Sequence, residues 1–380
     1  MTNLTKSLFR PASSQLLLAL SILAVAPGCD SQGETYIPPD SVVGETVISD
    51  GSLDEASTGA DMGPGWDWWS GDLLAWRAEQ IPLKEVFHGI SGVDDGDGYA
   101  VYVVGFRGAV LQYHSAVGEW TDVSPATSRS VEGVWALGPE RVWICGEQGL
   151  LMRYEAPAGA SYPEWNDETD PLRTETVNSI HGTGPDDIWA VGDDALILHR
   201  TAAGWEEFPK TALGWPAGDE RDLFMVWAAA PDHVFVGGEG YFGFWDGAEW
   251  KTIWSSADSY LAVAASGDTI WLGTDGGYLW SYDGEIWVKQ AAPVYYDYNA
   301  IWVAEDGRVF ATGEDPSPQS IIWIGKKEPW EQLEVISPEG VAEQWAITEN
   351  SLITGLWGRD PEDLFVCTQQ QQILRYSKHP

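Results

Sequence analysis

One short phrase recurs along this chain and limits the folds that the chain can adopt. It reads GTGPDDIWAVG at 182–192, and related forms stand at 138–146 (GPERVWICG), 230–238 (APDHVFVGG) and 358–368 (GRDPEDLFVCT). Aligned on the central aromatic residue, the chain contains seven units that follow one another at intervals of 36 to 55 residues. Such a period predicts repeated supersecondary units. The seven anchor residues are Tyr102, Trp143, Trp189, Phe235, Trp271, Phe310 and Phe365.

Each unit consists of short β-like runs separated by turn residues. In the third unit, VNSIHG, DIWAVG, ALILHR and GWEEF are the four expected strands. Pro-Asp-Asp separates the first two runs; Pro fixes φ and Asp bonds to nearby backbone, so the phrase is the turn and second strand of the unit. Four strands in about 40 residues predict one blade of a β-propeller.

The two ends of the chain complement each other. A tryptophan marks the fourth strand of the first six units, but the seventh unit ends at ILRYSKHP without one. The sequence AWRAEQIP around Trp76 matches GWEEFP around Trp205. An open last blade would expose a strand edge, so we expect the N-terminal strand to cover it. The prediction is an all-β, seven-bladed β-propeller of four-stranded blades over 73–380, closed by an N-terminal strand that completes the last blade.

These repeats resemble the Trp-rich β-propeller repeats of exported lipoproteins common in myxobacteria and related bacteria. They are more distantly similar to Asp-box and photosystem assembly-factor-like propellers. The resemblance covers roughly 73–380 and implies a fold more strongly than an activity, because propellers serve as enzymes, receptors and scaffolds.

The first residues predict export. Lys6 and Arg10 precede an apolar run, LLLALSILAVA at 16–26, which is short for a membrane span. The following APGC at 26–29 resembles the end of a bacterial lipoprotein signal peptide, which implies lipid attachment at Cys29. The alternative is a cleaved secretory signal with an incidental Cys. The predicted domains are a signal peptide at 1–28, a disordered acidic tether at 29–72 and the propeller; the predicted location is the outer membrane or cell surface, with the periplasmic side as an alternative.

The charge of the chain excludes one class of partner. There are 58 acidic and 20 basic residues, a net charge of -38. Nucleic-acid binding needs cationic side chains that displace counterions from phosphates, so we exclude it. We expect a monomer, held at the membrane only by its N-terminal lipid, whose partner is an envelope protein or glycan and can be cationic. Cys145 and Cys367 occupy equivalent places in non-neighbouring units, so we expect buried free thiols.

The sequence contains no pattern that demands catalysis, a cofactor or a bound metal. HExxH and CxxC are absent. DDGDGY at 94–99 offers oxygen ligands to calcium, but an acidic hairpin turn is the alternative. SYDGEIW at 281–287 and FWDGAEW at 244–250 approach the structural Asp-box hairpin. A further recurrent position is expected to pack between inner strands, with a sugar-stacking ring as the alternative; it holds His88, Trp135, His181, Trp227, Val263, Trp302 and Trp357.

The candidate ligand face follows from strand alternation. The loops between second and third strands and the connectors between blades should share one face, where the longest connectors lie. We expect exposed aromatic residues surrounded by carboxylates there, so the favoured function is a binding or assembly module. The alternatives are a glycoside hydrolase or lyase that uses these carboxylates, and a purely structural surface protein. The candidate residues are Asp193, Asp194, Trp215, Glu239, Asp275, Tyr295, Tyr296, Glu314 and Trp345.

Overall fold

The computed structural model describes most of the predicted propeller. It covers residues 74–378 apart from 95, 97, 158–159, 161, 256–257, 267–268, 291–296, 315–319, 326–330 and 333–351. The predicted signal peptide and tether lie outside the described residues, so they stay predictions. The chain divides into two units, Met1–Gly65 and Trp66–Pro380, and all that follows concerns the second.

The described strands form seven four-stranded antiparallel sheets, here called blades 1 to 7. Blade 1 contains β2 (Phe87–Asp94), β3 (Tyr99–Gly105), β4 (Val110–His114) and β5 (Glu119–Asp122). Blade 2 contains β6 (Val131–Gly138), β7 (Arg141–Gly146), β8 (Leu150–Glu155) and β9 (Glu164–Asp167). Blade 3 contains β10 (Val177–Gly184), β11 (Asp187–Gly192), β12 (Leu196–Thr201) and β13 (Gly204–Phe208). Blade 4 contains β14 (Leu223–Ala230), β15 (His233–Gly238), β16 (Tyr241–Trp245) and β17 (Trp250–Ser255).

The remaining three blades follow the same order. Blade 5 contains β18 (Tyr260–Ser266), β19 (Thr269–Thr274), β20 (Leu279–Tyr282) and β21 (Trp287–Lys289). Blade 6 contains β22 (Asp297–Val303), β23 (Val309–Glu314), β24 (Ser320–Gly325) and β25 (Glu331–Gln332). Blade 7 contains β26 (Ile353–Asp360), β27 (Asp363–Thr368), β28 (Ile373–Lys378) and β1 (Leu74–Ala78). Three short 3-10 helices lie in loops: η1 (Phe106–Gly108), η2 (Glu147–Gly149) and η3 (Lys210–Leu213).

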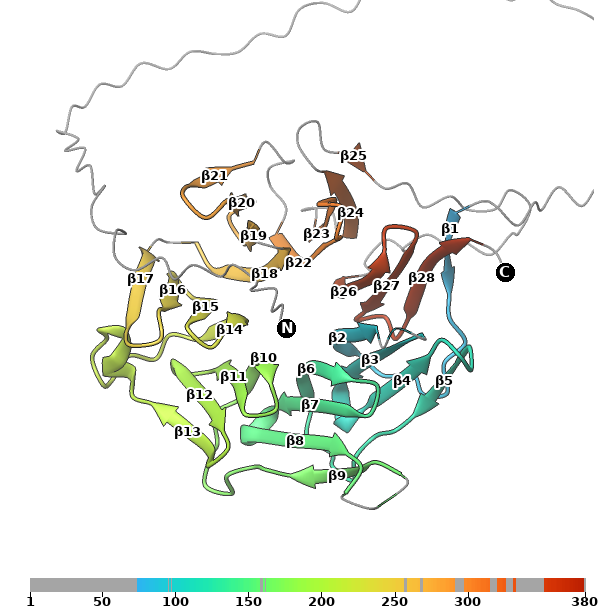
Figure 1. Ribbon diagram of the computed structural model, residues 1–380, viewed down its shortest axis with the longest axis horizontal. Coiled ribbons are helices and arrows are strands. Elements are labelled where there is room, and N and C mark those ends of the chain that lie inside the picture. Colours follow the sequence, from blue (N-terminus) through green and yellow to red (C-terminus); the bar gives the residue numbers. More distant parts are fainter. Residues whose placement is uncertain are drawn as a thin grey trace, which may run out of the picture. The chain divides into compact units, whose positions relative to one another are not determined.

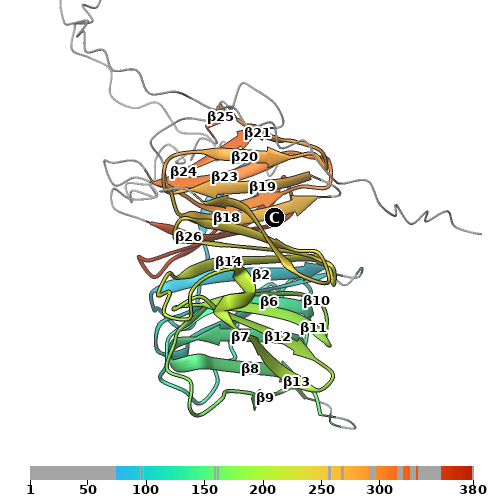
Figure 2. The same cartoon turned by 90° about the vertical axis from the view of Figure 1, so that its left-hand side faces the viewer.

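The first strand of each blade is the innermost, and each inner strand contacts the inner strands of the two adjacent blades. Figure 1 shows β2, β6, β10, β14, β18, β22 and β26 around a common axis, and Figure 2 shows the same sheets from the side. This arrangement confirms the prediction of an all-β propeller with four-stranded blades.

The recurrent phrase forms the most buried strand of each blade. In β11, Ile188 to Gly192 are all buried, without the alternation expected of a strand that has one wet face. A second strand packs against a neighbouring blade on each side, so both of its faces must be apolar. Trp143, Trp189, Tyr102 and Phe365 are among the largest fully buried side chains. The anchor residues therefore recur because every blade needs the same double-faced core strand.

The N-terminal strand lies on the edge of blade 7. β1 pairs antiparallel with β28 from Leu74 opposite Lys378 to Ala78 opposite Leu374, and Figure 1 shows the two strands side by side. The Trp76 side chain is 3% exposed, and its ring lies 5.3 Å from that of Tyr376. β1 supplies the fourth strand that the C-terminal repeat lacks and covers the β28 edge.

In blades 1, 2 and 3 the recurrent tryptophan of the outer strand donates a hydrogen bond to the preceding blade. Trp165 Nε1 donates to the Val123 carbonyl at 2.6 Å. Trp120 Nε1 donates to Glu79 Oε2 at 3.1 Å, and Glu79 follows β1 directly. Buried indole N–H groups need an acceptor, and here the acceptor is supplied by the neighbouring blade. This contact fastens blade 1 to the N-terminal strand in the same way as blade 2 is fastened to blade 1.

The inner strands pack large rings onto small residues of the next blade. A Cβ placed on Gly92 would lie 2.4 Å from the Trp357 ring, and one on Gly358 would lie 2.9 Å from the Trp302 ring. The Trp135 ring covers Gly182 in the same way. The predicted packing between inner strands is confirmed at these boundaries.

Two members of the predicted inner-strand series were wrong. The residue opposite Tyr102 is Ser91, not His88, because the turn between β2 and β3 is longer than in other blades. The residue opposite Trp271 is Ala264, not Val263, because β18 lacks the bulge that β10 has before its turn. The residue that faces the anchor therefore changes where turn length or bulge count changes.

The close contact at Gly92 predicts a strong effect of one methyl group. Gly92→Ala should lower the free energy of unfolding by about 1–3 kcal/mol, because the Trp357 ring belongs to another blade and must move. Gly184→Ala is the matched control, since nothing lies within 4 Å of a Cβ at that position. Chemical denaturation of both variants measures the difference. Equal effects of the two substitutions would contradict this description of the boundary between blades 7 and 1.

Candidate functional site

The loops after the second strands and the connectors between blades lie on one face, here called the connector face. In six blades, the backbone N–H of the residue after the second strand donates to the carbonyl of the connector residue before the inner strand. The pairs are Phe106 to Val86, Glu147 to Ser130, Asp193 to Thr176, Glu239 to Asp222, Asp275 to Ser259 and Gln369 to Leu352. The predicted grouping of these loops is confirmed. The opposite face, called the hairpin face, carries the other two turns of each blade.

Three predicted ligand residues of the connector face act as backbone caps. Asp275 Oδ1 accepts a hydrogen bond from the Ser259 N–H at 2.7 Å, which returns the bond that the Asp275 N–H makes to the Ser259 carbonyl at 3.1 Å. Asp193 Oδ2 and Glu239 Oε2 accept from the equivalent connector N–H groups, each at 3.4 Å. Glu147 does the same in blade 2 at 2.9 Å. The acids recur because each one fixes a connector onto its own blade.

Asp194 belongs to a crowded group of carboxylates between blades 3 and 4. It has a positive φ of 55°, and its N–H donates to Asp222 Oδ1 at 2.9 Å. Burial raises the pKa of Asp222, and the neighbouring charges of Asp193, Glu239 and Asp194 raise it further. The three predicted acids therefore do lie close together, around Asp222, which the sequence analysis had not selected as a ligand residue.

Trp215 is buried, so the prediction of an exposed aromatic platform at this residue was wrong. Its side chain is 8% exposed and meets the Tyr241 ring edge to face, with 4.4 Å between ring centroids. The Arg221 guanidinium lies over the indole at 3.8 Å from the ring centroid and is held by Asp219 at 2.8 Å. A long connector folded back on its own blade explains the burial, and sequence alone gave no sign of it.

The side chains of four further candidates are not described by the structure. Tyr295, Tyr296 and Trp345 lie outside the described residues. Glu314 is the last residue of β23, where its backbone pairs with Asp297, and its side chain is not described. These four residues stay predictions.

The central channel is lined by the inner strands of all seven blades. Its volume is about 210 Å³. Its polar lining side chains are Glu132, Asn178, Ser179, Asn299 and Thr354, and its apolar lining residues include Phe224, Leu261 and Val263. Four of the polar residues occupy one level, the bulged residue near the start of the inner strand, which lies toward the connector face: Glu132, Asn178, Asn299 and Thr354. The channel mouth on this face is therefore polar.

Side chains at this level fasten neighbouring blades to each other. Thr354 Oγ1 donates to the Phe87 carbonyl of blade 1 at 2.8 Å. His88 Nδ1 lies 3.2 Å from the Val131 carbonyl of blade 2, and Asn178 Nδ2 donates to the Leu223 carbonyl of blade 4 at 3.0 Å. Asn178 also donates to Asp193 Oδ1 at 2.9 Å, which ties the channel mouth to the acids of the connector face.

Glu132 lies at the same level of its inner strand, but its carboxylate has no proton to donate to the next blade. His88 contacts this carboxylate instead. His88 Nδ1 lies 2.9 Å from Glu132 Oε2. Burial alone would lower the pKa of His88, but the hydrogen bond and charge of Glu132 outweigh it and raise that pKa. Burial likewise opposes the charge of Glu132, yet His88 and Ser130 lower the pKa of Glu132 overall. The sequence analysis missed this pair, although both residues hold the second position of an inner strand.

His181 behaves in the opposite way. Its ring stacks on Trp227 with centroids 4.2 Å apart, and its Nδ1 accepts the Ala228 N–H of the next blade at 3.2 Å. Burial lowers the pKa of His181 to about 4. His181 is therefore a neutral packing residue between blades 3 and 4. It lies two blades away from His88, so the two cannot share a metal.

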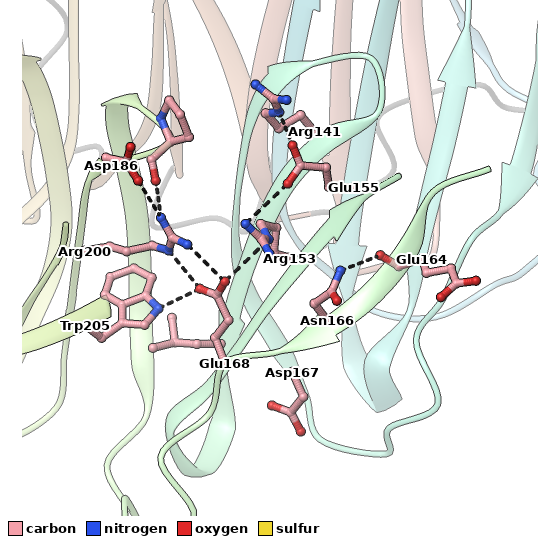
Figure 3. Close-up of polar contacts among 12 residues, drawn as sticks. Arg141, Arg153, Glu155, Glu164, Asn166, Asp167, Glu168, Asp186, Arg200 and Trp205 are labelled. Carbon is pink, nitrogen blue, oxygen red and sulfur yellow. Dashed lines mark hydrogen bonds and ion pairs between the residues drawn. The ribbon is translucent and has the colours of Figure 1, made fainter. Parts of the chain in front are cut away.

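The boundary between blades 2 and 3 is filled by an ionic network near the outer strands (Figure 3). Glu168 Oε2 accepts from Arg200 Nε at 3.0 Å and from Trp205 Nε1 at 2.9 Å. Arg153 Nε lies 3.5 Å from Glu168 Oε1, and Arg200 also pairs with Asp186 at 3.5 Å. The Arg200 side chain is only 12% exposed. This network fastens two blades, and its charged groups are matched within the chain.

The acidic hairpins are turns. Asp246 Oδ1 accepts the backbone N–H groups of Ala248 and Glu249, each at 2.9 Å. Asp283 Oδ1 accepts those of Glu285 and Ile286 at 3.0 and 2.9 Å. The Asp-box-like segments are therefore hairpins, as the sequence suggested.

The calcium alternative at 94–99 is only partly within the described residues. Asp94 Oδ1 accepts the Gly96 N–H at 2.8 Å, and Asp94 Oδ2 lies 3.2 Å from Arg359 Nε. Asp95 and Asp97 lie outside the described residues. Among the described residues, no group of three or more His, Cys, Asp or Glu could hold a metal ion. Asp94 acts there as a turn residue and ion-pair partner.

Cys145 and Cys367 are both buried free thiols, as predicted. They lie in β7 of blade 2 and β27 of blade 7, and burial raises the pKa of each thiol. Neither thiol is activated for nucleophilic chemistry. None of the helices in the part of the chain that the structure describes is long and apolar enough to cross a membrane.

Comparison with solved structures gives the same fold at low sequence identity. YCF48 bound to D1 peptide is 13% identical, with a TM-score of 0.59, and the match covers 80% of this chain and 98% of that one. YCF48 from Cyanidioschyzon merolae is 15% identical, with a TM-score of 0.59 and coverage of 80% and 99%. The WD40 β-propeller domain of Doa1 is 14% identical, with a TM-score of 0.57 and coverage of 81% and 97%.

These similarities confirm that the chain is a β-propeller repeat protein. They show its fold and not its function. No protein-family model and no curated protein matches the chain. The expected relation to Trp-rich lipoproteins stays a prediction.

The two inner-strand histidines, His88 and His181, predict opposite titrations. By NMR, His88 should titrate above its ordinary pKa of 6.5, and His181 at about 4. The raised folded pKa means that the His88 charge stabilises the fold below pH 6.5 and that this contribution is lost as pH rises through the folded pKa. Glu132→Gln should lower the His88 pKa and leave that of His181 unchanged. Titration of both rings near 6.5 would refute this description.

Proposed function

We propose that this chain is a binding or assembly module that uses the connector face of a closed, seven-bladed ring to hold a protein partner with a cationic surface. The observation that carries the proposal is the set of fixed carboxylates around the polar channel mouth. Glu147, Asp193, Glu239 and Asp275 each accept a connector N–H, so their positions are set before any partner arrives. Preorganised charge lowers the ordering cost of binding.

Electrostatics favours a cationic protein over other partners. The chain carries a net charge of -38, which attracts cationic surfaces at long range. At Asp222 the like charges of Asp193, Glu239 and Asp194 add up without cancelling, and a partner cation would relieve this repulsion. YCF48, a structural neighbour, has been solved bound to a peptide, which supports a protein partner by analogy of fold. A glycan is the weaker candidate, because Trp215, which was expected to provide an exposed aromatic surface, is buried.

We infer that the module works at the cell envelope. The support is the sequence of the first residues: a positive start, an apolar run and APGC, which resemble a lipoprotein signal peptide and would direct a lipid to Cys29. The 29–72 segment, which lacks Lys and Arg, would hold the propeller away from the membrane. We do not propose a glycosidase or lyase, because the described carboxylates of the connector face bind backbone N–H groups.

Site-specific crosslinking in intact cells tests this function. Leu172 on the connector face is 88% exposed, and Val117 on the hairpin face is 69% exposed. A photo-crosslinking amino acid at Leu172 should give one discrete protein adduct, and the same group at Val117 should give none. Cys29→Ser should move the chain out of the membrane fraction and reduce the adduct.

Adducts of equal yield from both faces, or none from Leu172, would refute the connector-face assignment. Membrane retention of the Cys29→Ser chain would refute the lipid anchor but would not affect the assignment of the connector face as the binding surface.

A further inference from the structure

The central channel contains one ionisable side chain in an otherwise uncharged lining. The residues that line its 210 Å³ come from all seven inner strands, and among them only Glu132 carries a charge. The rest are neutral polar residues, glycines and aliphatic residues such as Ile90, Ile180 and Val226. In a chain with 58 acidic residues, a single carboxylate at the axis is a specific feature.

The carboxylate is kept in place by the architecture of the ring. Thr354 of blade 7 and Asn178 of blade 3 donate across to the first carbonyl of the next blade, and His88 Nδ1 of blade 1 lies 3.2 Å from the equivalent carbonyl of Val131. Glu132 has no proton to donate to blade 3. His88 instead holds Glu132 Oε2 from the side of blade 1 at 2.9 Å, which orients the carboxylate at the polar mouth. The Glu132 side chain remains 26% exposed, so a ligand can reach it.

The size of the channel limits the ligand. Small-molecule pockets usually measure about 300–1,000 Å³, and this channel is smaller, at 210 Å³. It has room for one extended side chain but is too small for a saccharide chain. Its lining, uncharged apart from Glu132, can admit a methylene stem, and its carboxylate suits a cationic head.

We propose that the channel mouth binds one lysine or arginine side chain of a partner protein, with its charged head against Glu132. This proposal rests on the proposed function of the connector face and names the chemistry of its partner. The surrounding fixed acids attract a basic segment, and the channel selects one residue from it. The 30–72 segment of this chain contains no Lys or Arg and cannot supply that residue.

Model peptides test the proposal directly on the full chain. The probes are acetyl-Ala-Ala-X-Ala-Ala-amide with X as lysine, arginine, norleucine or glutamate, titrated by calorimetry or NMR. The lysine and arginine peptides should bind with a Kd on the order of 1 mM, and the other two at least about tenfold more weakly. Norleucine keeps the apolar stem and removes the charge, so this comparison needs no variant of the protein.

A matched pair of variants locates the contact. Glu132→Gln should weaken binding of the lysine peptide by about tenfold or more. Glu140→Gln, an exposed acid in the hairpin turn of the same blade, should leave it unchanged. Equal binding of lysine and norleucine peptides, no saturable binding of either cationic peptide, or binding that survives Glu132→Gln would overturn the proposal. A Leu172 adduct together with any of these results would leave the proposed function standing and remove only the channel site.

Discussion

The structure depends on the pairing of β1 with β28. A ring of blades built from one chain has a first and a last sheet that must meet, and the C-terminal repeat provides only three strands for the last one. The strand from Leu74 to Ala78 completes this sheet, so the two ends of the chain hold each other by backbone hydrogen bonds. Trp76 adds a buried ring, and Glu79 continues the link by accepting the Trp120 indole of blade 1. These contacts link blade 7, the N-terminal strand and blade 1.

The other boundaries repeat a small set of contacts at fixed levels. Near the connector face, a polar side chain at the second inner position reaches the next blade, as in Thr354 to Phe87. Nearer the hairpin face, a ring covers a small residue, as Trp357 covers Gly92. At the periphery of blades 1 to 3, the outer-strand indole N–H donates to an acceptor in the preceding blade, as Trp205 does to Glu168. These contacts fix the inner strands and their loops, and a site built on rigid elements keeps its geometry. The channel mouth and its carboxylates lie on these rigid elements and are therefore held in place.

Much of the fold could be predicted because the same sequence pattern recurs in each blade, so an assignment made in one repeat can be checked in the others. The anchors from Tyr102 to Phe365, the turn chemistry and the position of Trp76 were all visible as repeated patterns. The loops of the candidate site were placed on the correct face for the same reason. The roles of their residues were not visible: Asp193, Glu239 and Asp275 looked like ligand groups, but they cap connector N–H groups, which a linear sequence does not bring together. The prediction that Trp215 is exposed was wrong because its burial depends on contacts with Tyr241 and Arg221. Glu132 was not predicted because the sequence alone does not show that its side chain meets His88 at the channel.

The most direct test of this account is native-state hydrogen exchange of the β1 amides. Local opening of a strand is governed by the contacts that it shares with its sheet. If β1 is the fourth strand of blade 7, its hydrogen-bonded amides, those around Trp76 included, should exchange as slowly as those of β28 and open together with them. Exchange of the β1 amides as fast as in the exposed hairpin turns, with β28 still protected, would show that the strand does not close the ring and would contradict the account.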